Sequence, residues 1–168
     1  MKKNIFYVVT FLIGISLQVV VPKLFSPFGF TPQFLLILTM YIALIRGPVV
    51  GELMGFLWGL SADGISVALF GSQALLLTII GFISGKMNKT LDESKSWAQI
   101  MFVLMLSCLY FIGLYIVYHI FAEPGRHISI TSLIFHPLIN ALLAPVIFWF
   151  FKHWVQWWFP KSSLRIKL

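Results

Sequence analysis

The sequence predicts an all-α protein, a polytopic membrane helical bundle of about six transmembrane helices in a single domain over residues 1–168. Two observations predict this fold class. First, 60% of the residues are hydrophobic and only 10% are charged, whereas soluble chains carry about 25% charged residues. A soluble domain of this length could not bury so much apolar surface. Second, the apolar residues gather in six segments that turn residues and charges separate.

The six segments are predicted to be helices, followed by a tail that lies along the membrane interface. The helices are expected over residues 4–21, 32–45, 49–62, 70–85, 97–121 and 131–151, and the tail over residues 152–168. Spanning a bilayer takes about 20 residues. The second and third segments, which flank Gly47 and Pro48, are therefore short spans or a re-entrant pair, tolerable where protein surrounds them. The first segment lacks a small-x-small cleavage site, so we expect it to be retained.

The Lys and Arg residues predict that both termini are cytoplasmic. With a cytoplasmic N-terminus, 10 of the 12 Lys and Arg residues fall on the inner side, and only Lys23 and Arg126 fall outside. Short loops rich in Lys and Arg stay in the cytoplasm. Topology thus explains the net charge of +7, and no nucleic-acid partner is predicted. Trp154, Trp157 and Trp158 stand near lysines, a composition typical of the membrane interface, and are predicted interface anchors.

A stripe of small residues marks the third segment. Gly51, Gly55 and Gly59 recur every four residues, so on a helix they form one smooth face that lets another helix approach closely. The sequence is compatible with two interpretations. The stripe packs against another helix of the same bundle, or it is the face that receives a partner helix or a second copy of the chain.

Two acidic residues flank that stripe. Glu52 and Asp63 are eleven residues apart, almost three helical turns, so both fall near the glycine face. Acidic side chains inside a membrane usually face protein or water. Arg46 is close enough in sequence to neutralise Glu52. For Asp63 three roles are open: a helix-end residue that meets water, a hydrogen bond to a neighbouring helix end, and a proton relay or ion site.

The sixth segment carries His136 and Asn140, which are four residues apart and share one helix face. An asparagine in lipid seeks a hydrogen-bond partner on another helix, and Ser72 and Gln73 of the fourth segment are the expected partners. His136 is either a packed, hydrogen-bonded side chain or a pH switch or ligand contact.

The sequence holds no recognisable catalytic equipment. It has no GxSxG, HExxH or P-loop motif, and its single cysteine, Cys108, has no partners with the spacing of a metal site. We therefore predict a protein that is not an enzyme and that needs no cofactor or metal, with membrane lipid as its surroundings.

Four stretches resemble one protein family. They are Thr-Pro-Gln-Phe-Leu-Leu-Ile-Leu at residues 31–38, Gly51 with Gly-Phe-Leu-Trp-Gly-Leu-Ser-Ala-Asp at residues 55–63, Phe-Gly-Ser-Gln-Ala-Leu at residues 70–75, and Ile-Asn-Ala-Leu-Leu-Ala-Pro at residues 139–145. Together they resemble the rod shape-determining protein MreD family of bacteria. The most specific part covers residues 32–75, where glycines four residues apart lead to Asp63.

The resemblance implies a place in the bacterial cytoplasmic membrane and in the cell-elongation (Rod) complex. Proteins of this family associate with MreC, whose single transmembrane helix leads to a periplasmic domain. The complex links MreB to RodA and a penicillin-binding transpeptidase, which carry out peptidoglycan synthesis. The resemblance also implies a fold like the S components of energy-coupling-factor transporters, and it brings no catalytic residues.

Two functions follow as hypotheses. The first is a non-catalytic membrane scaffold that binds MreC and supports cell-shape control. The alternative is an S-component-like membrane protein that binds a small molecule such as a vitamin, with Ser72, Gln73, His136 and Asn140 around one pocket. Fold similarity alone is a weak warrant for the second.

Overall fold

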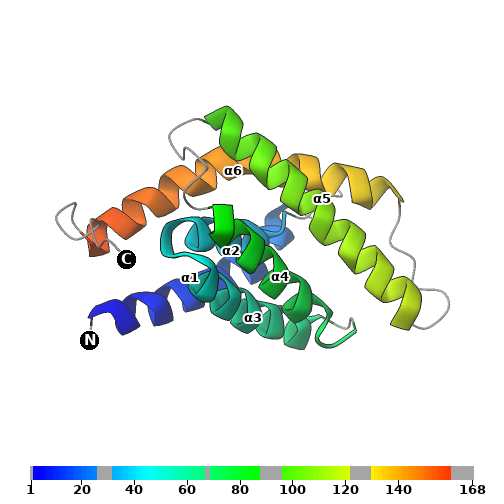
Figure 1. The fold of residues 1–168 in the computed structure, drawn as a ribbon, viewed down its shortest axis with the longest axis horizontal. Helices are drawn as coiled ribbons and strands as arrows, with labels where there is room; N and C mark the ends of the chain where they lie inside the picture. Colours follow the sequence, from blue (N-terminus) through cyan, green and yellow to red (C-terminus); the bar gives the residue numbers. More distant parts are fainter. Residues whose placement is uncertain (1, 26–31, 67–68, 88–95, 122–129, 160–168) are drawn as a thin grey trace.

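The computed structural model describes residues 2–25, 32–66, 69–87, 96–121 and 130–159, and these ranges are helical apart from short turns. Six helices follow one another (Figure 1). They are α1 (Lys2–Phe25), α2 (Phe34–Arg46), α3 (Pro48–Ile65), α4 (Ser72–Lys86), α5 (Ser96–Phe121) and α6 (Ile130–Trp158). The all-helical fold class and the order of the six segments agree with the prediction.

The last helix is longer than predicted. α6 continues to Trp158, so residues 152–158 are not a separate interfacial tail. Lys152 and His153 suggested an end to the apolar segment, but both side chains are exposed and long cationic side chains can reach polar surroundings from a continuing helix. Their neighbours Phe151 and Val155 are buried. The remainder of the predicted tail, residues 160–168, lies outside the described residues.

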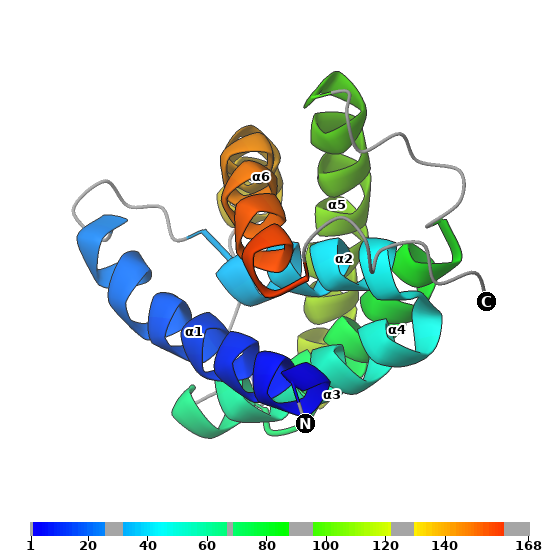
Figure 2. The same cartoon turned by 90° about the vertical axis from the view of Figure 1, so that its left-hand side faces the viewer.

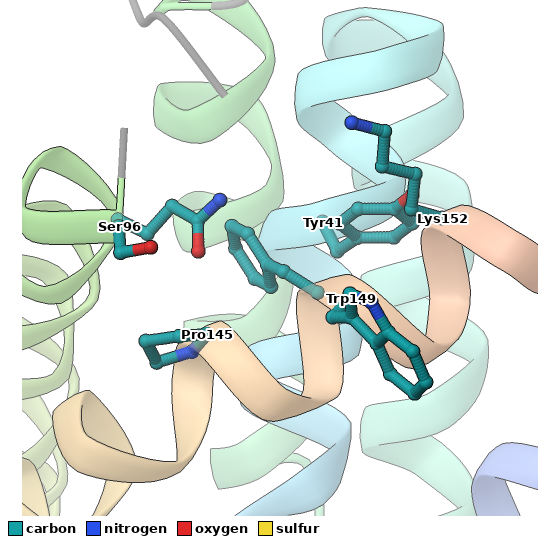
Figure 3. Close-up of a pocket in the computed structure, with 7 residues that line it drawn as sticks. Tyr41, Ser96, Pro145, Trp149 and Lys152 are labelled. Carbon is teal, nitrogen blue, oxygen red and sulfur yellow. The ribbon is translucent and has the colours of Figure 1, made fainter. Parts of the chain in front are cut away.

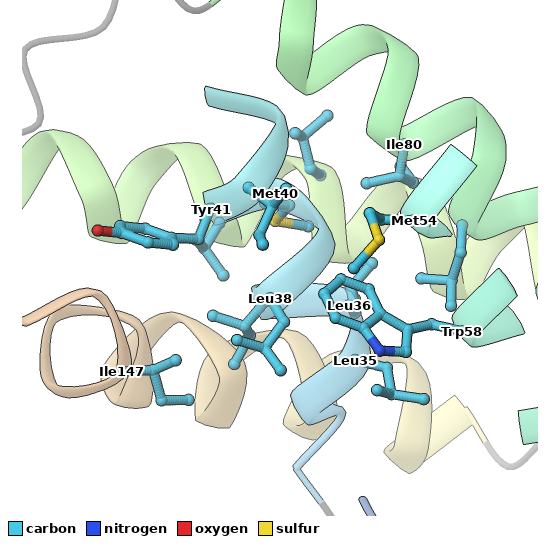
Figure 4. Close-up of a cluster of buried hydrophobic side chains, with 14 of the residues drawn as sticks. Leu35, Leu36, Leu38, Met40, Tyr41, Met54, Trp58, Ile80 and Ile147 are labelled. Atoms are coloured by element: carbon cyan, nitrogen blue, oxygen red, sulfur yellow. The ribbon is translucent and has the colours of Figure 1, made fainter. Parts of the chain in front are cut away.

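The short helix α2 is the centre of the protein. All ten residues from Leu35 to Leu44 are buried, and α2 contacts each of the other five helices. Figure 2 shows those helices disposed around it, and Figure 4 shows its side chains pointing outwards to Trp58 on one side and Ile147 on another. A helix that is apolar on every side belongs in a core. At about 1.5 Å per residue its 13 residues span only about 20 Å, so it lies enclosed by protein.

The α2–α3 turn is tight because one glycine makes it. Gly47 has a φ of 88°, a backbone conformation that residues with a side chain rarely adopt. Pro48 then occupies the first position of α3, where its missing N–H and fixed φ are tolerated. The turn lets α3 run back beside α2, and α4 packs along α3 (Figure 1).

Two ends of the protein can be distinguished. The N-terminus, the end of α6 and the α2–α3 turn lie together at the left of Figure 1, whereas the end of α5 lies at the right. Arg46 of α2 contacts the rings of Phe6 and Phe159, which joins the same end of three helices. We call this the Arg46 end. Lys86, in the last turn of α4, also lies there because Gly85 packs against Pro48.

Within the part of the chain that the structure describes, two helices are long and apolar enough to cross a membrane, Ser96–Phe121 and Leu133–Trp158. Ile5–Val21, Phe34–Arg46 and Ser72–Lys86 are apolar but shorter. The structure thus supports a helical membrane protein, and the number of six spans remains a prediction.

Candidate functional site

The glycine stripe of α3 faces α4. A Cβ atom added to Gly51 would lie 2.6 Å from the carbonyl oxygen of Gly81. At Gly55 and Gly59 the added atom would meet the backbone of Leu77 and Ala74 at similarly forbidden range. The two helix backbones are therefore as close as they can be, and only glycine fits at these three positions of α3.

Helix α4 also has glycines at this contact. A side chain at Gly81 would collide with the backbone of Gly51, and one at Gly85 would collide with Pro48. Because both surfaces are closed against each other, the stripe packs within the bundle. The interpretation of this face as an open docking site for a partner or a second copy is wrong. The physical reason is that α4 supplies the complementary small residues, which periodicity in α3 alone cannot reveal.

Asp63 continues the stripe, since it lies four residues after Gly59 on the same face of α3. Its side chain is only 2% exposed. One carboxylate oxygen accepts hydrogen bonds from the backbone N–H groups of Gly71 and Ala74, both at 3.0 Å. The other accepts from the N–H group of Gln73 at 3.1 Å. Asp63 therefore caps the first turn of α4 from the preceding helix.

This cap has a clear physical purpose. The first N–H groups of any helix have no partner within that helix, and Gly71 supplies no side chain to bind them. The same N–H groups carry the positive end of the helix dipole, which a carboxylate stabilises. The structure thus gives Asp63 a hydrogen bond to a neighbouring helix end, and not the contact with water that was the first alternative.

Ser72 and Gln73 belong to the same cluster. The hydroxyl of Ser72 donates to the carbonyl oxygen of Leu69 at 2.7 Å and lies 3.5 Å from Asp63. The side-chain amide of Gln73 donates to the hydroxyl of Ser66 at 3.2 Å. Neither contacts Asn140, so their predicted pairing with the sixth helix is wrong; they complete the turn between α3 and α4 instead.

Asn140 caps a different helix. It is fully buried, and its side-chain oxygen accepts a hydrogen bond from the backbone N–H of Gln33 at 3.0 Å, just before α2 begins. Its amide nitrogen lies 3.4 Å from the hydroxyl of Ser107 on α5. Gln18 of α1 accepts from the backbone N–H of Leu35 at 3.3 Å. Two side chains that are distant in sequence, Asn140 and Gln18, thus accept hydrogen bonds from backbone N–H groups at the start of α2.

The sequence interpretation missed Gln18. An uncharged polar residue in the middle of an apolar segment was the available signal, because such a residue must find a partner within the bundle. Its position in the first helix also explains how α1 is held beside α2, since its side-chain amide lies 3.4 Å from the side chain of Gln33.

His136 packs against an aromatic ring. Its imidazole meets the ring of Phe111 edge-on, with 5.2 Å between the ring centroids. Within the described part of the chain its buried Nδ1 has no hydrogen-bond partner. Ser72, Gln73, His136 and Asn140 therefore do not surround one pocket, and none of them lines either of the two cavities discussed below. The hypothesis of an S-component-like protein that binds a small molecule was based on these four residues, so the structure gives it no pocket built from them.

Arg46 contacts aromatic rings and not the predicted acidic partner. Its guanidinium lies 4.6 Å from the centroid of the Phe159 ring and 5.6 Å from that of Phe6. Its Nε and Nη2 atoms are buried without a hydrogen-bond partner among the described residues. A cation over aromatic faces is stabilised by their quadrupoles. Glu52 is half-buried on α3.

The three predicted tryptophan anchors divide into two kinds. Trp154 donates from its indole nitrogen to the buried hydroxyl of Thr10 on α1 at 3.2 Å, and Trp158 packs edge-on against Phe6. Only Trp157, which is 74% exposed, faces outwards from the bundle. Two of the three thus join α6 to α1.

A further helix contact depends on Trp58, which is fully buried. Its indole N–H donates to the carbonyl oxygen of Phe11 at 3.2 Å. A side chain at Gly14 would collide with the same indole ring. Trp58 therefore joins α3 to α1.

These observations define the class: an all-helical protein, with helices able to cross a membrane, whose conspicuous polar residues close helix ends. The family model for rod shape-determining protein MreD matches residues 2–156. The chain belongs to this family, as its sequence resemblance predicted, and membership implies a role in determining rod shape. No curated protein and no solved structure matches the chain significantly.

Proposed function

We propose that this chain is a non-catalytic membrane scaffold of the bacterial cell-elongation complex, that it binds the transmembrane helix of MreC, and that it thereby supports peptidoglycan synthesis. The observation that carries the proposal is the family match over residues 2–156. The structure supports it because Asp63 and Asn140, the most buried of the candidate polar residues, hold helix ends in place and so rigidify the bundle. MreB, RodA and a penicillin-binding transpeptidase are the further partners, direct or through MreC.

We further propose that the Arg46 end faces the cytoplasm. Arg46 and Lys86 lie there, together with both ends of the described chain (Figure 1). Lys23, in the last turn of α1, is at the opposite end of its helix. Cytoplasmic segments are enriched in Lys and Arg, so this orientation places both termini inside. It also puts the Asp63 cluster towards the periplasmic side.

The partner helix requires a surface other than the glycine stripe. An open hollow of about 590 Å³ runs beside the first half of α5. Its lining is Met87, Trp97, Ala98, Met101, Phe102, Leu104, Met105 and Cys108. We call it the α5 groove. No charged residue lines it, which suits an apolar transmembrane helix, and methionines adapt readily to the shape of a partner. We assign the α5 groove to MreC.

Bulky substitutions test this assignment. Met105 is 58% exposed in the groove, and Leu142 is 70% exposed on α6 outside it. Met105→Trp is expected to reduce the amount of MreC that co-purifies with the protein several-fold, because the indole fills the hollow. Leu142→Trp is the matched control and should leave it unchanged. Equal co-purification with both variants, at equal expression, would overturn the assignment. A disulfide between the Cys108 residues of two copies would show instead that the groove is the interface of a homodimer.

A further inference from the structure

A second, smaller cavity lies between α2, α5 and α6. Its volume is about 190 Å³. The side chains that line it are Tyr41 of α2, Ser96 and Gln99 of α5, and Pro145, Phe148, Trp149 and Lys152 of α6. Figure 3 shows Ser96 and Lys152 on either side of it and Trp149 and Pro145 along its α6 wall. We call it the Lys152 cavity.

The polar groups of this cavity can all donate hydrogen bonds, and one of them is a cation. Tyr41 and Ser96 contribute hydroxyl groups, Gln99 an amide and Lys152 an ammonium group. The two acidic residues of the described chain, Glu52 and Asp63, are not among the lining residues. The described lining residues of the cavity therefore complement a negative charge.

Ser96 is the first described residue of α5, and its hydroxyl adds a hydrogen-bond donor to the lining. The cavity and its lysine thus point to an anionic ligand.

Its size and position narrow the choice of anion. A water molecule occupies about 30 Å³ in the liquid, so the cavity has room for about six water molecules and for a phosphate group. Pockets for drug-sized molecules measure about 300–1,000 Å³, so a vitamin does not fit. Lys152 lies near the end of α6 that joins the Arg46 end, and Trp149 beside it is 63% exposed. Lysine with exposed tryptophan is typical of the level of lipid headgroups.

We propose that the Lys152 cavity binds the phosphate group of an anionic membrane lipid, at the surface where the termini lie. Lys152 supplies the charge, and the hydroxyl of Ser96 supplies a hydrogen-bond donor. Phe148 and Pro145 form the apolar wall along which the lipid extends towards the bilayer. The proposal is independent of the partner that occupies the α5 groove, because the two hollows share no lining residue.

The test measures binding of phosphatidylglycerol to the purified full chain in detergent, by native mass spectrometry, with phosphatidylcholine as the reference lipid. Lys152→Gln removes the charge. Ser96→Phe fills the cavity from an exposed position and leaves the charge unchanged. Lys86→Gln is the matched control, since Lys86 is an exposed lysine at the same end whose ammonium lies over the Phe82 ring at 4.3 Å.

Lys152→Gln is expected to weaken phosphatidylglycerol binding at least about tenfold, the size of one hydrogen bond to a charged group. Ser96→Phe should do the same. Lys86→Gln should change it less than about threefold, because Lys86 does not line the cavity and a distant exposed charge contributes little. Inorganic phosphate that binds with the same dependence on Lys152 would show that a soluble phosphate fills the site and would overturn the lipid as its source. Equal effects of Lys152→Gln and Lys86→Gln, or no preference for phosphatidylglycerol, would overturn the site itself.

Discussion

Replacing Asp63 with alanine is expected to destabilise the protein severely. The substitution removes the acceptor of three backbone N–H groups in the first turn of α4. The carboxylate is 2% exposed, so water does not replace it readily. Each buried donor left without a partner costs about 1–3 kcal/mol, which gives about 3–9 kcal/mol for the three. Total stabilities of protein domains are about 5–15 kcal/mol, so a large share of the stability would be lost.

The assay is unfolding of the purified protein in mixed micelles, followed by far-ultraviolet circular dichroism as the denaturing detergent increases. Asp63→Asn retains one acceptor oxygen and should lose about half as much free energy of unfolding as Asp63→Ala. Glu52→Ala is the matched control, an acidic residue on the same helix that is half-buried. It should change the free energy of unfolding by less than about 1 kcal/mol. An Asp63→Ala protein as stable as the Glu52→Ala protein would refute the capping argument.

Three further predictions concern the same helix contacts. Gly59→Ala should destabilise the protein by about 1–3 kcal/mol because its methyl group collides with α4. Gly64→Ala is the control: a Cβ atom at Gly64 has nothing within 4 Å, so this substitution should stabilise the protein by up to about 1 kcal/mol. The same unfolding assay compares the two variants. Asn140→Ala removes the cap of α2 and should lower the free energy of unfolding by about 1–3 kcal/mol; an unchanged value would show that the start of α2 finds another acceptor. Trp154→Phe should cost about 1 kcal/mol through the lost hydrogen bond to α1, whereas Trp157→Phe, at a 74% exposed position, should be nearly neutral, and equal losses would contradict this difference.

The sequence predicted the helices well because apolar periodicity and breaks are local properties. The tight turn at Gly47 and Pro48 was anticipated, because glycine and proline have specific backbone roles there. The predicted end of the first helix at Val21 was wrong, since α1 continues through Pro22 to Phe25. The end of α6 was wrong because Lys152 can stay in the helix and still reach polar surroundings. A charge in the sequence shows where polar surroundings are available, not where a helix stops.

The contacts between helices were harder to predict because each has two sides. The stripe that contains Gly51 showed a close approach, but only the position of Gly81 in space shows that α4 closes it. Asn140 was expected to find a partner, and it does so at the backbone of Gln33. A backbone N–H group carries no sequence signal, so a side chain that caps a distant helix cannot be matched to its target from sequence.

We propose that the transmembrane helix of MreC lies in the α5 groove of this protein. The most direct measurement is photo-cross-linking in living cells, with p-benzoylphenylalanine placed at Met105 in the groove or at Leu142 on the exposed face of α6. We expect an adduct with MreC from position 105 and none from position 142. An MreC adduct from position 142 alone, or adducts of equal yield from both positions, would show that MreC does not occupy the α5 groove.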